Sequence, residues 1–89
     1  MRVKWLRRAL ANLDEEAAYV ARDNPAAAAQ LVRTIELAVG RLARFPAMGR
    51  PGRVAGTREL VVAGTPYIIP YRVRHDALEI LRVFHAARK

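Results

Sequence analysis

Positively charged side chains near the end of the chain are the residues best suited to chemistry. His85 and Arg88 stand close to the C-terminus, and Arg72 and Arg74 lie in the β-like segment before them. A metal-free ribonuclease needs a base for the 2′-hydroxyl, an acid for the leaving oxygen and fixed cations for the charged phosphorane, and histidine and arginine suit these roles. The same cations suit the acidic side chains of a protein partner, or simply keep the sheet soluble, and we expect one of these roles first.

The sequence has no other group of residues typical of a catalytic or metal site. The absence of cysteine removes thiolate nucleophiles, disulfides and cysteine-based zinc sites together. The two histidines are ten positions apart, and His75 falls in a predicted turn. Asp14, Glu15 and Glu16 are consecutive, so on a helix their carboxylates point in different directions. We therefore expect no metal and no cofactor.

Length and composition indicate one globular domain, residues 1–89. A chain of this size buries only ~60–65% of the surface that its unfolded form exposes, which allows one modest core. The composition, 53% hydrophobic and 27% charged, is that of a folded protein. No apolar run approaches the roughly 18–20 residues that span a bilayer, and acidic residues from Asp14 onward interrupt any signal-peptide pattern. We expect a soluble, cytoplasmic protein with no membrane partner.

The net charge predicts a partner of opposite sign. Sixteen Lys and Arg residues against eight Asp and Glu residues give +8. Such a field favours phosphate backbones or an acidic protein. Only Lys4 and Lys89 are lysines, and an Arg-rich codon bias would produce the same excess, so the charge is weak evidence for nucleic acid in particular.

The first half of the chain predicts a short strand followed by a helix hairpin. Residues 1–5 alternate between polar and apolar, as a strand does. From Leu6 the apolar residues take helical spacing, at Leu6, Leu10, Leu13, Ala17 and Val20. Asn24 and Pro25 suit the N-cap and first turn of a second helix. The apolar stripe of that helix is Leu31, Ile35, Ala38, Val39 and Leu42, and residues 46–56 follow as a loop.

The last third predicts three antiparallel strands, residues 58–63, 67–74 and 78–85, packed on the helices in an α+β fold. Gly64-Thr65, with glycine first, and His75-Asp76 suit two-residue turns, which set the cross-strand register. The more apolar face is expected to pack on the helices and carries Leu60, Val62, Tyr67, Ile69, Tyr71, Val73, Leu78, Ile80 and Phe84, with Arg58 and Arg82 as exceptions. The second face carries Glu59, Val61, Ile68, Pro70, Arg72, Arg74, Glu79, Leu81, Val83 and His85, a mixture that suits a groove covered by a partner.

Two details follow from this register. Arg72 falls opposite Glu79, which is a favourable cross-strand pair. Pro70 lies in mid-strand, where proline implies an edge or a bulge.

Several stretches, in order along essentially the whole chain, carry a family resemblance. They are residues 19–28 at the turn between the helices, 45–52 in the loop, 56–62 and 66–73 in two strands, and 80–88 with a His-x-x-Arg ending. With the outline of strand, helix hairpin and three strands, they resemble the RelE/ParE family of bacterial type II toxins. The resemblance implies a toxin neutralised by a small acidic antitoxin, whose disordered C-terminal segment folds onto the toxin. It also implies that operator DNA is contacted only through the antitoxin.

The family has two branches with different targets. The RelE-like branch cuts messenger RNA on the ribosome, and the ParE-like branch inhibits DNA gyrase. The nucleases typically carry an arginine in an Arg-Leu-Val-Tyr pattern of the third strand, whereas residues 68–71 here read Ile-Ile-Pro-Tyr. Ile68 stands where that cation would be, and isoleucine cannot stabilise a phosphorane.

We therefore expect a gyrase inhibitor that is not an enzyme. A ribosome-dependent endoribonuclease using His85 with Arg72, Arg74 and Arg88 is the alternative, and an inactive toxin that only binds its antitoxin is a third possibility. The expected partner-binding residues are Arg58, Ile68, Arg72, Arg74, Leu81, Val83, His85 and Arg88.

Overall fold

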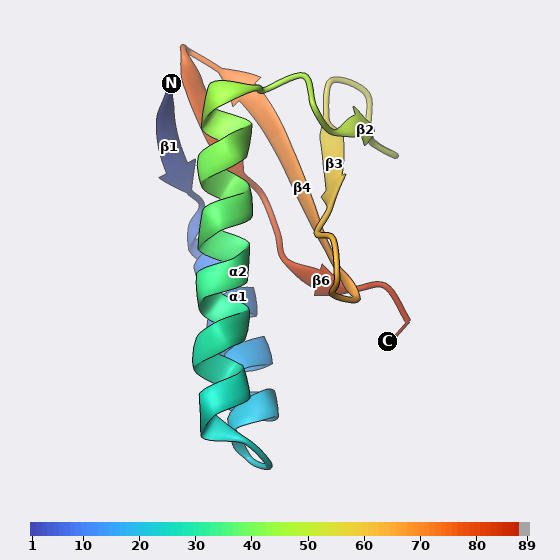
Figure 1. Cartoon of the computed structure of the whole chain (residues 1–89). Coiled ribbons are helices and arrows are strands. Elements are labelled where there is room, and N and C mark those ends of the chain that lie inside the picture. The colour runs from blue at the N-terminus through green and yellow to red at the C-terminus, as the bar shows by residue number, and fades with distance from the viewer. Residues whose placement is uncertain (88–89) are drawn as a thin grey trace.

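A helix hairpin covers one face of a small mixed sheet in the computed structural model, which describes residues 1–87 (Figure 1). The elements in chain order are β1 (Arg2–Trp5), α1 (Arg7–Ala21), α2 (Pro25–Arg44), β2 (Arg50–Pro51), β3 (Arg58–Val61), β4 (Tyr67–Arg74), β5 (Ala77–Ile80) and β6 (Phe84–His85). We call the side of the sheet toward the helices the inner face and the other side the open face. The expected α+β fold is confirmed, with a two-residue strand, β2, inside the predicted loop.

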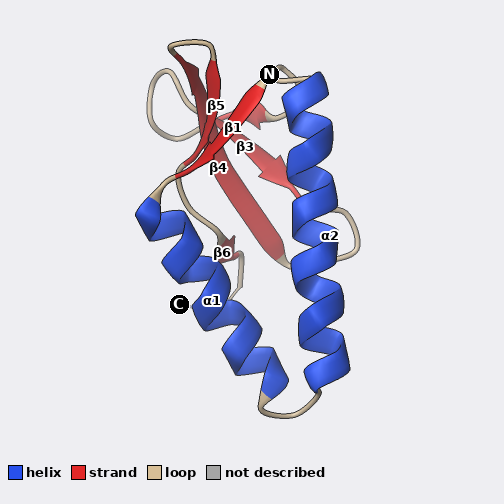
Figure 2. Ribbon diagram, turned by 90° about the vertical axis from the view of Figure 1, so that its left-hand side faces the viewer, coloured by secondary structure: helices blue, strands red, loops and turns tan. Residues whose placement is uncertain are grey.

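The two helices form where the sequence predicts them. Asn24 caps α2, since its side-chain Oδ1 accepts a hydrogen bond from the Ala27 amide at 3.0 Å and Pro25 follows as the first helical residue. One expectation about α1 is wrong: Leu10 is 47% exposed, and Ala9 takes its place in the core beside Leu13. The small side chain of Ala9 suits a close approach of the helix to its neighbours. Figure 2 shows the helices meeting at their connecting turn and diverging toward the other end, with the sheet behind them.

The sheet places the N-terminal strand beside β5, which comes from the last third of the chain. The strand order is β1-β5-β4-β3-β2, and β6 pairs with β4 beyond the end of β5. β1 lies parallel to β5 at the sheet edge, and all other pairs are antiparallel. Residue Arg2 is the partner of Ala77, and Lys4 is the partner of Glu79.

The predicted register of the main strands is confirmed. Arg58 pairs with Tyr71 between β3 and β4, and Arg72 pairs with Glu79 between β4 and β5. The turn between β3 and β4 differs from the prediction, because the Thr65 amide donates to the Val62 carbonyl at 3.1 Å. Gly64 is therefore third in the turn, with a φ of 76°, at the position where type II turns favour glycine. Pro66 has no N–H to close the two-residue turn that the sequence indicated.

The predicted last strand is interrupted by one extra residue. Tyr71 pairs with Ile80 and Ile68 pairs with Phe84, so two residues of β4 oppose three residues, 81–83, of the other strand. This is a bulge opposite Pro70, whose carbonyl accepts a hydrogen bond from the Leu81 amide at 2.9 Å. The Oδ1 atom of Asn12 on α1 accepts from the Val83 amide at 3.2 Å. The bulge reverses which side chains beyond it face the helices.

The core lies between the hairpin and the inner face. It contains Ala9 and Leu13 of α1, Ile35, Ala38, Val39 and Leu42 of α2, and Val62, Tyr67, Ile69, Tyr71, Leu78, Ile80 and Val83 from the strands and the segments beside them. Val3 and Trp5 of β1 pack against it. Val83 is 1% exposed, so its expected place on the open face is wrong. Phe84 and His85 likewise exchange faces relative to the prediction.

Candidate functional site

The structure separates the cations that the sequence grouped together. His85 pairs with Tyr67, whose side chain belongs to the core, so His85 lies on the inner face. Arg72 and Arg74 lie on the open face, opposite the core residues that alternate with them. Arg88 lies outside the described residues. The candidate nuclease set is therefore not brought together among residues 1–87, because the bulge at 81–83 turns His85 to the other side of the sheet.

His85 contacts both β4 and the residues that follow it in the chain. Its ring makes an edge-to-face contact with the Tyr67 ring, with centroids 5.4 Å apart. Its Nδ1 accepts a hydrogen bond from the Ala87 amide at 3.1 Å. An acceptor at Nδ1 places the proton of the neutral ring on Nε2. The Tyr67 hydroxyl in turn donates to the Glu16 carboxylate at 2.9 Å, so α1 and the end of the sheet are tied together.

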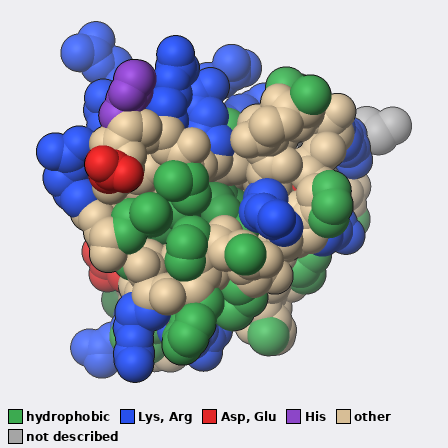
Figure 3. Space-filling model, turned by 90° about the horizontal axis from the view of Figure 1, so that it is seen from above, with side chains coloured by type: hydrophobic (Ala, Val, Ile, Leu, Met, Phe, Trp, Pro, Cys, Tyr) green, Lys and Arg blue, Asp and Glu red, His purple; other side chains and the backbone are tan. Residues whose placement is uncertain are grey.

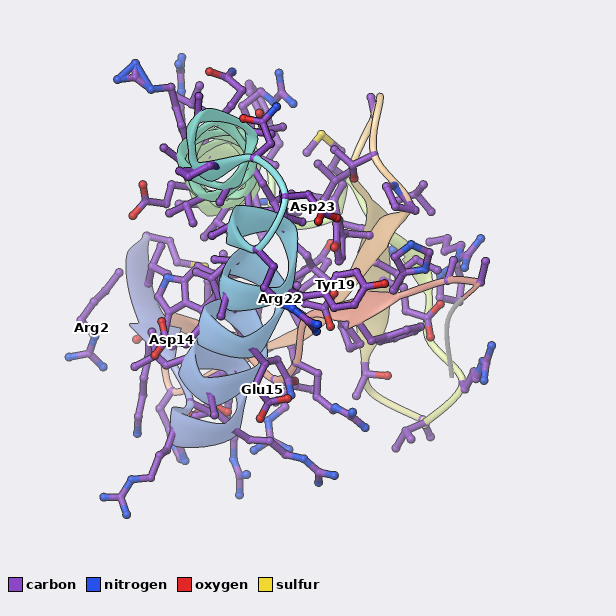
Figure 4. All side chains as sticks on the ribbon, turned by 90° about the horizontal axis from the view of Figure 1, so that it is seen from below. Arg2, Asp14, Glu15, Tyr19, Arg22 and Asp23 are labelled. Atoms are coloured by element: carbon purple, nitrogen blue, oxygen red, sulfur yellow. The ribbon has the colours of Figure 1, made fainter. Side chains whose placement is uncertain are left out.

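A groove lies between the helix hairpin and this end of the sheet. Its volume is about 460 Å³, and its walls are mainly apolar. It is lined by Tyr19, Val20, Ala27, Gln30, Leu31 and Thr34 from the helices, and by Gly64, Thr65, Pro66, Tyr67 and His85 from the strands and their turn. We call it the hairpin groove. Tyr19 extends from α1 toward the strands in Figure 4 and is half exposed.

Arg72 and Arg74 belong to a different surface, on the open face. The Arg72 Nε donates to the Glu79 carboxylate at 2.6 Å, as the predicted pairing requires. This hydrogen bond lowers the pKa of Glu79; burial of the carboxyl group opposes the shift, and the nearby charges of Arg72, Lys4 and Arg74 act in the same direction as the hydrogen bond. Glu79 is 8% exposed although no helix covers this face.

Of the other expected partner-binding residues, Arg58 holds a loop. Its Nη1 donates to the Gly49 carbonyl at 2.8 Å and to the Ala47 carbonyl at 3.4 Å. The loop is also held from the core, since the Tyr71 hydroxyl donates to the Pro46 carbonyl and accepts from the Gly49 amide, both at 2.8 Å. These contacts fix residues 46–49 against the sheet, which is a structural role for Arg58.

The apolar members of that set lie in different environments. Ile68 is buried on the open face, where it pairs with Val61 and Phe84. Leu81 is half-buried and lines a second hollow of about 280 Å³ on the open face, with Pro70 and Phe84 among its walls and Arg53 and Arg82 also lining it. Val83 is in the core and offers no surface.

Sequence reasoning missed several residues that the structure places at these two surfaces. Tyr19 and Tyr67 were assigned no role at a site, because one lies on a predicted helix and the other was placed on the sheet face that packs on the helices. Arg2 and Lys4 were identified only as the polar side of a short strand. The position of that strand beside β5 makes them neighbours of Arg72 and Arg74 on the open face, and local alternation contains no signal for that neighbour.

Among residues 1–87, no three His, Asp or Glu side chains come together in a way that could hold a metal ion. Neither helix in this part of the chain is long and apolar enough to cross a membrane.

Comparison with known proteins identifies the family. Residues 3–89 match the model of the ParE toxin of the type II toxin-antitoxin system parDE. Y4kP of Sinorhizobium fredii, which is named as a toxin, is 56% identical over 85 residues, covering 96% of this chain and 88% of that protein. Toxin RelE2 of Caulobacter vibrioides is 40% identical over 86 residues, covering 97% of this chain and 96% of the other.

Two solved structures share the fold. A chain of the chromosomal ParDE toxin-antitoxin system from P. aeruginosa superposes with a TM-score of 0.86 at 34% identity, covering 96% of this chain and 95% of that one. A chain of the RelBE2 toxin-antitoxin complex from Mycobacterium tuberculosis gives a TM-score of 0.62 at 31% identity, covering 94% and 95%. With a family model that spans nearly the whole sequence and relatives named as toxins, this chain belongs to the ParE toxin family of type II toxin-antitoxin systems.

Proposed function

We propose that this chain inhibits DNA gyrase and is neutralised by an acidic antitoxin. The separation of His85 from Arg72 and Arg74 by the sheet is the observation that carries the first half of the proposal. A general base and the cations that stabilise a phosphorane must meet at one phosphate, within hydrogen-bond reach. Residues on opposite faces of one sheet cannot do so.

Ile68 supports the same conclusion. A buried isoleucine occupies the position where the nuclease pattern has an arginine, and its neighbours across the sheet are Val61 and Phe84. The immediate neighbours of Ile68 are therefore apolar, and this position offers no charge to a reacting phosphate, although Arg53 and Arg82 line the adjoining hollow. An apolar surface is better suited to binding a protein, because its burial on association is favourable.

The hairpin groove supports the second half of the proposal. It is open, largely apolar and of a size that accepts side chains of a peptide segment. The charge of +8 favours an acidic segment, and folding of that segment in the groove would bury its apolar side chains. The solved complexes that match this fold are named as a ParDE system and a RelBE2 complex, which is the pairing proposed here.

Induction of the chain alone in cells tests the target. Gyrase inhibition predicts a DNA-damage response with intact translated messages, and the purified chain should stop supercoiling by gyrase. Messages cut within codons, without a damage response, would instead establish the ribonuclease alternative. Normal growth of induced cells that contain the folded chain would contradict both and favour an inactive toxin.

His85→Ala distinguishes a role of His85 in antitoxin binding from a role in catalysis. We expect toxicity without antitoxin to persist and neutralisation by the antitoxin to weaken about 10-fold or more, because a side chain lining the groove is lost. The matched control is His75→Ala, in the exposed turn between β4 and β5. Growth assays with titrated antitoxin measure both effects, and loss of both toxicity and RNA cleavage in a folded His85→Ala chain would make His85 catalytic.

A further inference from the structure

Four basic side chains form one patch on the open face. The pairings Arg2–Ala77–Arg74 and Lys4–Glu79–Arg72 form two adjacent rows across β1, β5 and β4. The alternate residues Val3, Trp5, Leu78 and Ile80 pack in or against the core, so these rows point away from the helices. We call Arg2, Lys4, Arg72 and Arg74 the basic patch. Figure 3, which looks down on the end carrying the β4–β5 turn, shows many Lys and Arg side chains at its upper and left margins, and others at the lower left and on the right.

The charges in this patch are largely uncompensated. Glu79 is the one acidic residue in the two rows, and it pairs with Arg72 through Nε, which leaves other guanidinium donors of Arg72 available. Arg2, Lys4 and Arg74 are exposed, and Arg2 extends outward from β1 in Figure 4. Ala77 and Glu79 are 2% and 8% exposed on a face without helices, which is expected where long basic side chains lay their stems over the strands.

The spacing of the four cations suits a ligand that carries several negative charges rather than a single one. Residues two apart on a strand are about 6.7 Å apart, and β1 and β4 are separated by two strand spacings, or about 9.6 Å. Two pairs of cations thus face outward over an area larger than one carboxylate or phosphate. A ligand that satisfies all four must itself carry regularly repeated negative charge.

The composition of the patch distinguishes the ligand classes. Its members are cations, with Ala77 between them in one row and Glu79 in the other, and no aromatic or large apolar side chain lies in the two rows. Protein interfaces need a desolvated core rich in aromatic and apolar groups, which these rows lack. Binding of unpaired nucleic-acid strands relies on aromatic platforms for the bases. Backbone phosphates of a duplex need only cations and hydrogen-bond donors.

We propose that the basic patch binds the phosphate backbone of duplex DNA, independently of sequence, through Arg2, Lys4, Arg72 and Arg74. This interaction belongs to the toxin itself, in addition to the operator contact expected through the antitoxin. It does not depend on the identity of the cellular target. The patch lies on the face opposite the hairpin groove, so an antitoxin in that groove leaves it accessible.

The experiment measures binding of the purified full chain to a fluorescent duplex of about 20 base pairs and mixed sequence, at a series of salt concentrations. Four neutralised phosphates give a slope of about −3.6 in log affinity against log salt, or about a 100-fold loss between roughly 50 and 200 mM. In Arg2→Gln/Arg74→Gln the slope should fall to about −1.8, with only about a 10-fold loss over the same range.

The matched control is Arg22→Gln/Arg33→Gln, which removes the same charge from exposed positions at the end of α1 and on α2. It should keep the slope of the unaltered chain. Circular dichroism and melting confirm that both variants fold.

The proposal fails if the two double variants lose affinity and slope equally, because the binding then reports net charge alone. It also fails if an unpaired oligonucleotide binds more tightly than the duplex. A third contrary outcome is that the patch variant binds the duplex normally but loses a poly-glutamate peptide, which would make the patch a site for acidic proteins.

Discussion

At the scale of single residues, Tyr71 links the sheet to the loop that precedes β3. It is completely buried, and its hydroxyl is bonded to both the Pro46 carbonyl and the Gly49 amide. Tyr71→Phe keeps the ring and leaves both loop groups without this partner, so we expect a loss of about 1–3 kcal/mol in the free energy of unfolding. Urea denaturation measures it.

Tyr19→Phe is the control for this substitution, because Tyr19 is half exposed and water can replace contacts of its hydroxyl. A loss equal to that of Tyr71→Phe would mean that the loop contacts contribute little. The loop itself leaves little room for adjustment, since a Cβ atom at Gly49 would lie 2.5 Å from the Tyr71 hydroxyl oxygen and 2.8 Å from the Glu59 carbonyl oxygen.

We expect Glu79 to make the stability of the folded protein depend on pH. Its pKa is lowered in the folded protein, chiefly by the hydrogen bond from Arg72. The folded state therefore binds fewer protons at this group than the unfolded state, and its contribution is present above the ordinary carboxyl pKa and lost as the pH falls through the lowered value. We expect Glu79→Gln to be less stable at neutral pH and to match the unaltered chain in acid.

Thermal melts from neutral to acid pH measure this difference. Glu59→Gln is a matched control, because Glu59 is also buried and paired with an arginine. Its Oε1 atom lies 3.1 Å from the Nη2 atom of Arg50 on β2. A constant gap between Glu79→Gln and the unaltered chain at every pH would contradict the prediction, since a shifted pKa requires the gap to close in acid.

At the scale of secondary-structure elements, the β4–β5 turn gives the two strands their predicted register, but two of its residues have a strained backbone. His75 and Asp76 have φ values of 52° and 60°, which two-residue turns of type I′ require at both central positions. Residues with a Cβ resist this region, whereas glycine enters it without steric cost. We expect Asp76→Gly to raise the free energy of unfolding by up to about 1 kcal/mol, measured by denaturation.

Gly64→Ala is the reverse test in the β3–β4 turn. Gly64 has a φ of 76°, and a Cβ atom there would meet nothing within 4 Å, so a loss of stability reports backbone strain that exceeds the gain from a less flexible unfolded chain. An increase in stability for Gly64→Ala, or a decrease for Asp76→Gly, would contradict this account of the turns.

At the scale of the whole molecule, net charge opposes compactness. A charge of +8 on 89 residues repels itself, and the repulsion is greatest when the chain is folded. Salt screens these interactions with a Debye length of about 10 Å at 0.1 M, so we expect the melting temperature to rise by several degrees as sodium chloride increases from low to moderate concentration. A falling melting temperature would mean that ion pairs such as Arg72–Glu79 outweigh the repulsion.

Much of the fold could be predicted from the sequence because its determinants are local. Asn24 and Pro25 mark the start of α2 within the chain itself, and strand alternation with two turn signals is sufficient to set the pairing of Arg72 with Glu79. The family motifs likewise depend only on residue order. Leu10 was misplaced because Leu10 and Ala9 are adjacent on α1, and helical spacing alone does not show how the helix is rotated against the sheet.

By itself, therefore, the sequence determined the helix hairpin, the strands β1, β3 and β4, the register of β3, β4 and β5, the basic charge and the family, whereas β2 and the break between β5 and β6 were not predicted. Only the tertiary structure decided which side chains share a surface. The bulge at 81–83 moves His85 to the inner face and Val83 into the core, and the parallel pairing of β1 with β5 brings Arg2 and Lys4 beside Arg72 and Arg74. Both results depend on contacts between residues far apart in the chain, because a bulge and a strand neighbour are selected by packing rather than by local periodicity.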